Sequence, residues 1–99
     1  MCRVMADRRF VYILRSDSNL SRHYVGLTSD VAKRLRWHNA GQNVHTVRDR
    51  PWSIVVSMEF AAEQAAYRFE RYLKSGSGRA FATRHFSSAK DAMPEETRR

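Results

Sequence analysis

Residues 24–38 have the sequence YVGLTSDVAKRLRWH, and this stretch joins a predicted strand to a predicted helix. Its first part is apolar, β-branched or aromatic, which is typical of a strand over His23–Leu27. The polar residues 28–30 offer side-chain acceptors for the free amides at the start of a helix. We therefore expect a helix that begins near residue 31 and ends at Gly41.

On the N-terminal side of this stretch, Phe10–Leu14 is a short apolar and aromatic run followed by turn residues 15–19. The pattern predicts a strand that pairs antiparallel with the next one through a polar hairpin loop. On the other side, residues 41–51 lack periodicity and predict a loop. Trp52–Phe60 predicts a third strand, and we expect it to be central because residues 54–56 are apolar without alternation.

The C-terminal half is expected to be helical. Apolar residues at helical spacing predict a helix over about Ala62–Lys74, which residues 75–78 break, and then a short helix over Arg79–Phe86. Residues 87–99 are polar and predict a flexible tail. A chain of 99 residues has room for one domain, which we place at residues 9–86, after an N-terminal extension of residues 1–8.

The net charge of +8 lies entirely in residues 1–86, which contain 15 basic and 7 acidic residues. Such an excess predicts a polyanionic partner, although a generically basic protein without a partner is the plain alternative. No apolar run reaches the roughly 18 residues of a membrane span, so we expect a cytoplasmic protein, at the nucleoid if the source is bacterial. The single cysteine, Cys2, leaves no internal disulfide or cysteine-based zinc site.

Several side chains could perform chemistry, although each alone is more often structural. Arg34 and His38 lie four residues apart and share one helix face. Gly26, two residues after Tyr24, lies on the same side of its strand and would leave open space beside that phenol, as a groove for a phosphate backbone requires. Glu70 lies among basic residues and is either a solvated carboxylate or a sparse Mg²⁺ ligand, since Mg²⁺ keeps several waters.

The order of these residues resembles that of the GIY-YIG nuclease family, in particular its small stand-alone members. Tyr12 ends the first motif, Tyr24 opens a Tyr-Val-Gly motif, Arg34 follows ten residues later, His38 four beyond it, and Glu70 lies on the next long helix. The resemblance covers about residues 9–86. Phe10 stands where the name-giving Gly of the first motif would be.

This resemblance implies an α+β fold with a three-stranded antiparallel sheet flanked by helices, in the order strand, strand, helix, strand, helix, short helix. It also implies that the sheet face with both tyrosines meets the faces that carry Arg34 and Glu70. Five catalytic residues follow from it: Tyr12, Tyr24, Arg34, His38 and Glu70. Six residues are expected to bind the nucleic acid, namely Lys33, Arg36, His45, Arg48, Arg50 and Lys74.

The implied activity is metal-dependent endonucleolytic hydrolysis of DNA, structure-selective or weakly specific, for example in DNA repair. Glu70 would hold Mg²⁺ or Mn²⁺, Arg34 would stabilise the developing charge, Tyr24 would position water or phosphate, and His38 would assist. Tyr12 would be the general base, or would only orient a hydroxide supplied by the metal. DNA is the expected partner and RNA a second candidate. Two alternatives remain open, a binding module that cuts poorly and acts with a partner, and a basic protein on RNA or the ribosome.

Overall fold

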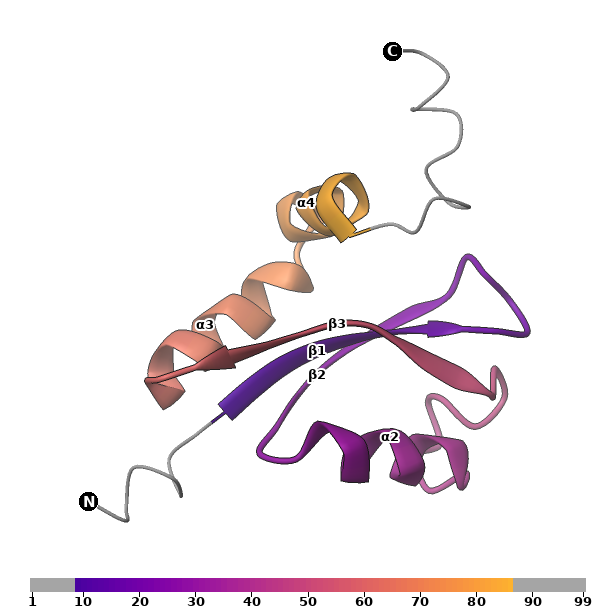
Figure 1. Cartoon of the computed structure of the whole chain (residues 1–99). Coiled ribbons are helices and arrows are strands. Elements are labelled where there is room, and N and C mark those ends of the chain that lie inside the picture. Colours follow the sequence, from indigo (N-terminus) through magenta and orange to yellow (C-terminus); the bar gives the residue numbers. More distant parts are fainter. Residues whose placement is uncertain (1–8, 87–99) are drawn as a thin grey trace.

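The computed structural model of the chain describes residues 9–86, and it shows a three-stranded antiparallel sheet with three helices (Figure 1). The elements in chain order are β1 (Arg9–Ser16), β2 (His23–Thr28), α2 (Val31–Asn39), β3 (Trp52–Phe60), α3 (Glu63–Leu73) and α4 (Gly76–Phe86). The predicted α+β class and element order are confirmed. The predicted extension and tail, residues 1–8 and 87–99, lie outside the described residues. Within residues 9–86, no helix is both long and apolar enough to cross a membrane.

The sheet order is β2-β1-β3, so the prediction that Trp52–Phe60 is the central strand is wrong. The apolar run at residues 54–56 has another cause. Val56 pairs with Ile13 and Ile54 pairs with Leu14, so Val55 is an extra residue at a β-bulge. A bulge interrupts the alternation of side chains, and Ile54 is 41% exposed as on an edge strand.

The central strand β1 is buried on both faces. Val11 and Ile13 face one way, into a core completed by Ala66 and Leu73 of α3 and by apolar side chains of α4, including the predicted Phe81 and Phe86. Tyr12 and Leu14 face the other way, toward Val31 and Leu35 of α2. Accordingly, α2 lies on one side of the sheet, whereas α3 and α4 lie on the other (Figure 1).

The start and end of α2 follow the predicted capping pattern. The Asp30 carboxylate accepts a hydrogen bond from the Lys33 amide at 3.0 Å, and the Thr28 hydroxyl accepts one from the Asp30 amide at 3.1 Å. At the other end, Gly41 has a φ of +84°, a conformation that favours glycine. These contacts fix the position of α2 beneath the tyrosine face of the sheet.

Helix α4 begins three residues earlier than predicted, at Gly76 rather than Arg79. The Ser75 hydroxyl accepts a hydrogen bond from the Gly78 amide at 3.1 Å, which is a helix N-cap contact. A Cβ at Gly78 would overlap the backbone carbonyl of Tyr72. Gly78 therefore allows close packing of α4 against the end of α3, rather than breaking the helix.

Candidate active site

The ring of Tyr12 lies over Gly26, the residue opposite it in the β1–β2 register. A Cβ at Gly26 would overlap the Tyr12 ring and hydroxyl. The space above Gly26 is thus filled, and the prediction of an open groove beside Tyr24 is wrong. The glycine instead allows a large side chain from the neighbouring strand to cross β2, with Tyr12 only 2% exposed.

Three of the predicted residues form one aromatic cluster. The ring centroids of Tyr24 and His38 are 4.7 Å apart, those of Tyr12 and Tyr24 6.3 Å, and those of Tyr12 and His38 6.0 Å. Tyr24 is partly exposed at the edge of the sheet, whereas Tyr12 and His38 are buried. Any substrate that reaches this cluster from solvent therefore meets Tyr24 first.

Both ring nitrogens of His38 have hydrogen-bond partners inside the protein. Nε2 is 3.0 Å from the Tyr12 hydroxyl, and Nδ1 is 2.9 Å from the Thr46 hydroxyl. The Thr46 hydroxyl is also in donor position to the Asn43 carbonyl, at 3.5 Å, so we assign Nδ1–H as the donor to Thr46. In this tautomer Nε2 accepts the proton of the Tyr12 hydroxyl.

Burial shifts the acidity of both partners. It raises the pKa of the Tyr12 phenol well above its ordinary value of 10.0; Tyr24 and Glu70 also raise it, and Arg34 lowers it. It lowers the pKa of His38 from 6.5, and the Arg34 cation acts in the same direction. At neutral pH the pair is therefore a protonated phenol and a neutral imidazole.

Arg34 extends from α2 with its guanidinium carbon 4.4 Å from the centre of the Trp37 ring. Cation–π stacking of this kind restrains the side chain. Together with Lys33 and the polar residues 28–30, Arg34 lines a small hollow of about 360 Å³ at the N-terminal end of α2. The two cations of this hollow lie beside the Asp30 carboxylate, which already accepts a hydrogen bond from the Lys33 amide at the start of the helix.

Glu70 is carried by α3, which lies on the opposite side of the sheet from α2 (Figure 1). Helix α3 packs against the face with Val11 and Ile13, so the expectation that the tyrosine face meets the Glu70 helix is wrong. Even so, the Glu70 charge acts on the Tyr12 hydroxyl. Its side chain is 13% exposed and forms an ion pair with Lys74, with 2.7 Å between Oε2 and Nζ.

As a metal ligand, Glu70 would be a single carboxylate. Among residues 9–86, no group of three or more His, Cys, Asp or Glu side chains could hold a metal. A lone, mostly buried carboxylate fits a magnesium-like cation, because such an ion keeps several waters and takes further oxygens from substrate phosphate. It does not fit a zinc site with a full set of protein ligands. A cation here would also compete with Lys74.

All six predicted nucleic-acid-binding residues are exposed, and two of them also have side-chain partners within the protein. Lys33 lies beside Arg34. Arg50 has a structural contact, since its Nε donates to the Val47 carbonyl at 2.9 Å, and Lys74 is paired with Glu70. No contact with a nucleic acid is part of the structure, so all six assignments stay predictions.

Thr46 and Asn39 are residues to which the sequence analysis gave no role. Thr46 is 1% exposed and holds His38, while its own carbonyl accepts the indole N–H of Trp52 at 2.8 Å. Asn39 exchanges two hydrogen bonds with the Trp52 backbone, at 2.7 and 3.1 Å. The loop of residues 41–51 is thereby tied to the end of α2. A threonine eight residues after His38 gives too weak a signal to find from one sequence.

The fold and site together define a small α+β domain in which an imidazole is hydrogen-bonded to the buried Tyr12 phenol, while a second phenol, a guanidinium and a carboxylate shift the pKa of that phenol. The family described as the GIY-YIG catalytic domain matches residues 8–86. The chain belongs to the GIY-YIG family, a family of nucleases, as predicted.

Known relatives agree with this assignment. The structure-specific endonuclease subunit SLX1 of Candida dubliniensis is 39% identical over 85 residues, which cover 79% of this chain and 28% of that protein. A UPF0213 protein of Haloquadratum walsbyi is 40% identical over 73 residues, which cover 72% of this chain and 79% of that protein. The solution NMR structure of a UPF0213 protein from Bacillus halodurans has a TM-score of 0.51 and 25% identity, and the match covers 86% of this chain and 93% of that one. The matches thus cover most of the two UPF0213 proteins but only 28% of the SLX1 relative.

Proposed function

We propose that this protein is a divalent-metal-dependent endonuclease that hydrolyses phosphodiester bonds in DNA. The observation that supports it most is the hydrogen bond between the buried Tyr12 hydroxyl and His38, in a site where Arg34 lowers and Glu70 raises the pKa of Tyr12. These residues come from β1, α2 and α3, so their grouping is a property of the fold and not of adjacency in sequence.

In this proposal, Tyr12 and His38 act as a pair on the attacking water. An ordinary phenol is about three pKa units from neutrality, or roughly 4 kcal/mol, and burial increases that gap. A preformed phenolate therefore contributes little at neutral pH. The phenol instead accepts the proton of the water as it passes its own proton to Nε2 of His38, which is unprotonated in the assigned tautomer.

Arg34 and Tyr24 contact the phosphate. Arg34 lines the hollow at the start of α2 and stabilises charge on the phosphate oxygens, a contribution worth about 10²–10³ in rate in comparable sites. Tyr24, partly exposed at the sheet edge, orients the phosphate or the water. Glu70 would hold Mg²⁺ or Mn²⁺, which supplies positive charge to the phosphate and the leaving oxygen.

The proposed substrate class rests on the net charge of the protein and on the lack, within residues 9–86, of a motif that recognises a DNA sequence. The net charge of +8 favours a polyanion, and residues 9–86 contain no helix-turn-helix or zinc finger that would read a long sequence. A related protein is named a structure-specific endonuclease subunit. We therefore infer selectivity for DNA shape, such as a branch or an unpaired strand, rather than for sequence.

A plasmid and branched-DNA cleavage assay with Mg²⁺ tests this function. Glu70→Ala should lower the rate at least about 1,000-fold and Arg34→Ala about 100-fold or more. Matched controls are Glu63→Ala, an exposed carboxylate on the same helix, and Arg84→Ala, an exposed arginine on α4. Equal weak cutting by wild type and all variants would reveal a contaminating nuclease and overturn the proposal.

A second candidate function is nucleic-acid binding without efficient cutting, with a partner as the catalyst. The ion pair between Lys74 and Glu70 favours it, because the carboxylate that would hold the metal already has a cation at 2.7 Å. Salt-sensitive DNA binding that survives Glu70→Ala, with no cleavage by wild type over a range of Mg²⁺ and Mn²⁺ concentrations, would support this candidate.

A further inference from the structure

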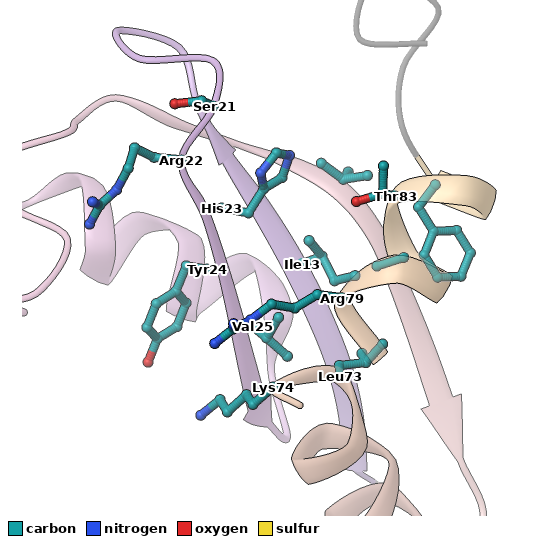
Figure 2. Close-up of a pocket in the computed structure, with 13 residues that line it drawn as sticks. Ile13, Ser21, Arg22, His23, Tyr24, Val25, Leu73, Lys74, Arg79 and Thr83 are labelled. Atoms are coloured by element: carbon teal, nitrogen blue, oxygen red, sulfur yellow. The ribbon is translucent and has the colours of Figure 1, made fainter. Parts of the chain in front are cut away.

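A hollow of about 530 Å³ lies between β2, β3, the end of α3 and α4. It is distinct from the cluster around Tyr12, because it is on the α4 side of the sheet (Figure 2). Its volume is within the usual range of roughly 300–1,000 Å³ for sites that bind small ligands. A mononucleotide unit would fit such a space.

The floor of this hollow is apolar. Figure 2 shows the side chains of Ile13, Val25 and Leu73 between β2 and α4. Further apolar lining residues are Val55, Ala82 and Phe86. An apolar floor with an aromatic ring suits the flat face of a nucleobase, which stacks on such side chains without sequence preference. It does not suit a free phosphate or a metal ion.

Basic residues line the hollow and acidic ones do not. Arg22, His23, Lys74 and Arg79 are among its described lining residues, and none of those is acidic. The charged ends of Arg22 and Lys74 extend on the side of β2 away from Thr83 (Figure 2), where Arg22 pairs with Asp49 and Lys74 with Glu70. Arg79 takes part in no ion pair among residues 9–86. An apolar floor beside this arginine matches a base joined to a phosphate.

The hollow also borders the candidate active site. Tyr24 lines it from the edge strand, and in Figure 2 its phenol and the Lys74 ammonium extend on the side of β2 away from Thr83. The same ammonium contacts Glu70 at 2.7 Å. A DNA strand with its scissile phosphate at Tyr24 and Glu70 would thus place an adjacent nucleotide at the mouth of the hollow.

We propose that this hollow binds an unpaired nucleotide next to the scissile phosphate, with the base on the apolar floor and its phosphate on Arg79. This inference rests on the proposed function and deepens it, because it names the feature of DNA that the site selects. A paired base must first leave the duplex, which costs a few kcal/mol, whereas an unpaired base enters without that cost. The hollow would therefore favour branched DNA over continuous duplex.

Binding measurements can test the proposal separately from cleavage. The full chain with Glu70→Gln, free of metal, is titrated by fluorescence anisotropy with three DNA probes. The first is a nicked duplex with one unpaired nucleotide, the second carries an abasic residue at that place, and the third is a continuous duplex. We expect the first probe to bind about tenfold more tightly than the other two.

Variants on α4 then test whether the preference for the unpaired nucleotide arises in the hollow. Thr83→Trp fills the hollow and should abolish the tenfold preference, whereas Thr83→Ala removes the same hydroxyl without filling it and should retain it. Arg79→Ala should weaken binding of the first probe severalfold. Arg84→Ala, on the same helix but outside the hollow, should change all three probes equally. Circular dichroism and thermal melting check that each variant is folded.

The outcomes separate the two proposals. No preference for the unpaired nucleotide, or a preference that Thr83→Trp leaves intact, overturns the nucleotide hollow even when wild type cleaves DNA in a Glu70-dependent way. A preference that is lost in Thr83→Trp and kept in Thr83→Ala supports the hollow. That result together with no cleavage by wild type would refute the endonuclease function and leave the binding site in place.

Discussion

The two faces of the sheet use one strand for different purposes. On the α4 side, Val11 and Ile13 of β1 enter an apolar core held by shape and burial. On the α2 side, Tyr12 of the same strand belongs to a hydrogen-bonded chain with His38 and Thr46. This difference predicts that the two faces tolerate different substitutions. The apolar face should be sensitive to changes in side-chain volume, and the polar face to the loss of single hydrogen-bonding atoms.

The largest loss of stability is expected on the apolar face. Phe69→Ala removes a ring that packs with Phe60 and Phe81, at centroid distances of 5.6 and 6.2 Å, and should lower the free energy of unfolding by about 3 kcal/mol. Tyr67→Ala on the same helix, 52% exposed, should change it by less than about 0.5 kcal/mol. Urea unfolding measures both. Equal losses of unfolding free energy in the two variants would contradict the prediction that the Phe69 ring belongs to the core and the Tyr67 ring does not.

On the polar face, Gly26→Ala should have the next largest effect. The new methyl would overlap the Tyr12 ring, so the ring must move, at a cost of roughly 1–3 kcal/mol in stability. A displacement of about 1 Å in the site is worth on the order of 100-fold in rate. Gly76→Ala is the control, since a Cβ there has no neighbour within 4 Å. Thermal melting and the cleavage rate of both variants check this, and an active Gly26→Ala protein would contradict it.

A smaller change tests the hydrogen-bonded chain itself. Thr46→Val keeps the shape of the side chain but leaves the His38 Nδ1–H without a partner in a buried place, at a cost of about 1 kcal/mol or more. The loss of this partner should also change the pH profile of cleavage. Thr46→Ser keeps the hydroxyl and should therefore have the stability and the pH profile of wild type. Were Thr46→Val to match wild type in both, the loop of residues 41–51 would have no part in positioning His38.

The smallest expected effect is a pH dependence of stability. Burial lowers the pKa of His38 in the folded state, so between that pKa and about 6.5 the unfolded chain binds more protons. The stabilisation is complete above about pH 6.5 and is lost as the pH falls toward the folded pKa. His38→Gln should therefore lose less stability than wild type between pH 7 and pH 5. The exposed His45→Gln should behave like wild type in the same melting series.

Local signals in the sequence predict much of this fold because the interactions are local. The Asp30 cap, the end of α2 at Gly41 and the apolar stripe of α3 depend on residues within a few positions of one another. The resemblance to a nuclease family likewise depends on spacing, and it selected residues that converge on Tyr12.

The errors concern relations between distant residues. The bulge at Val55 makes an edge strand look like a buried one, because alternation fails in both cases. The sequence predicts a groove at Gly26, but the Tyr12 ring from the neighbouring strand fills that space. The family resemblance predicts that the Glu70 helix meets the tyrosine face, yet α3 packs on the other face of the sheet. In each case the deciding contact joins residues that are far apart in the chain, and a single sequence does not show that such residues lie together.

Because Tyr12 lies in the middle strand, its position in the site depends on the stability of the whole domain. Central strands open only when the protein unfolds globally, whereas sites on loops can lose their shape through local fluctuations. With neighbours on both sides and 2% exposure, Tyr12 cannot leave its place while the sheet persists. Heat should therefore displace Tyr12 from the site only when the sheet itself unfolds.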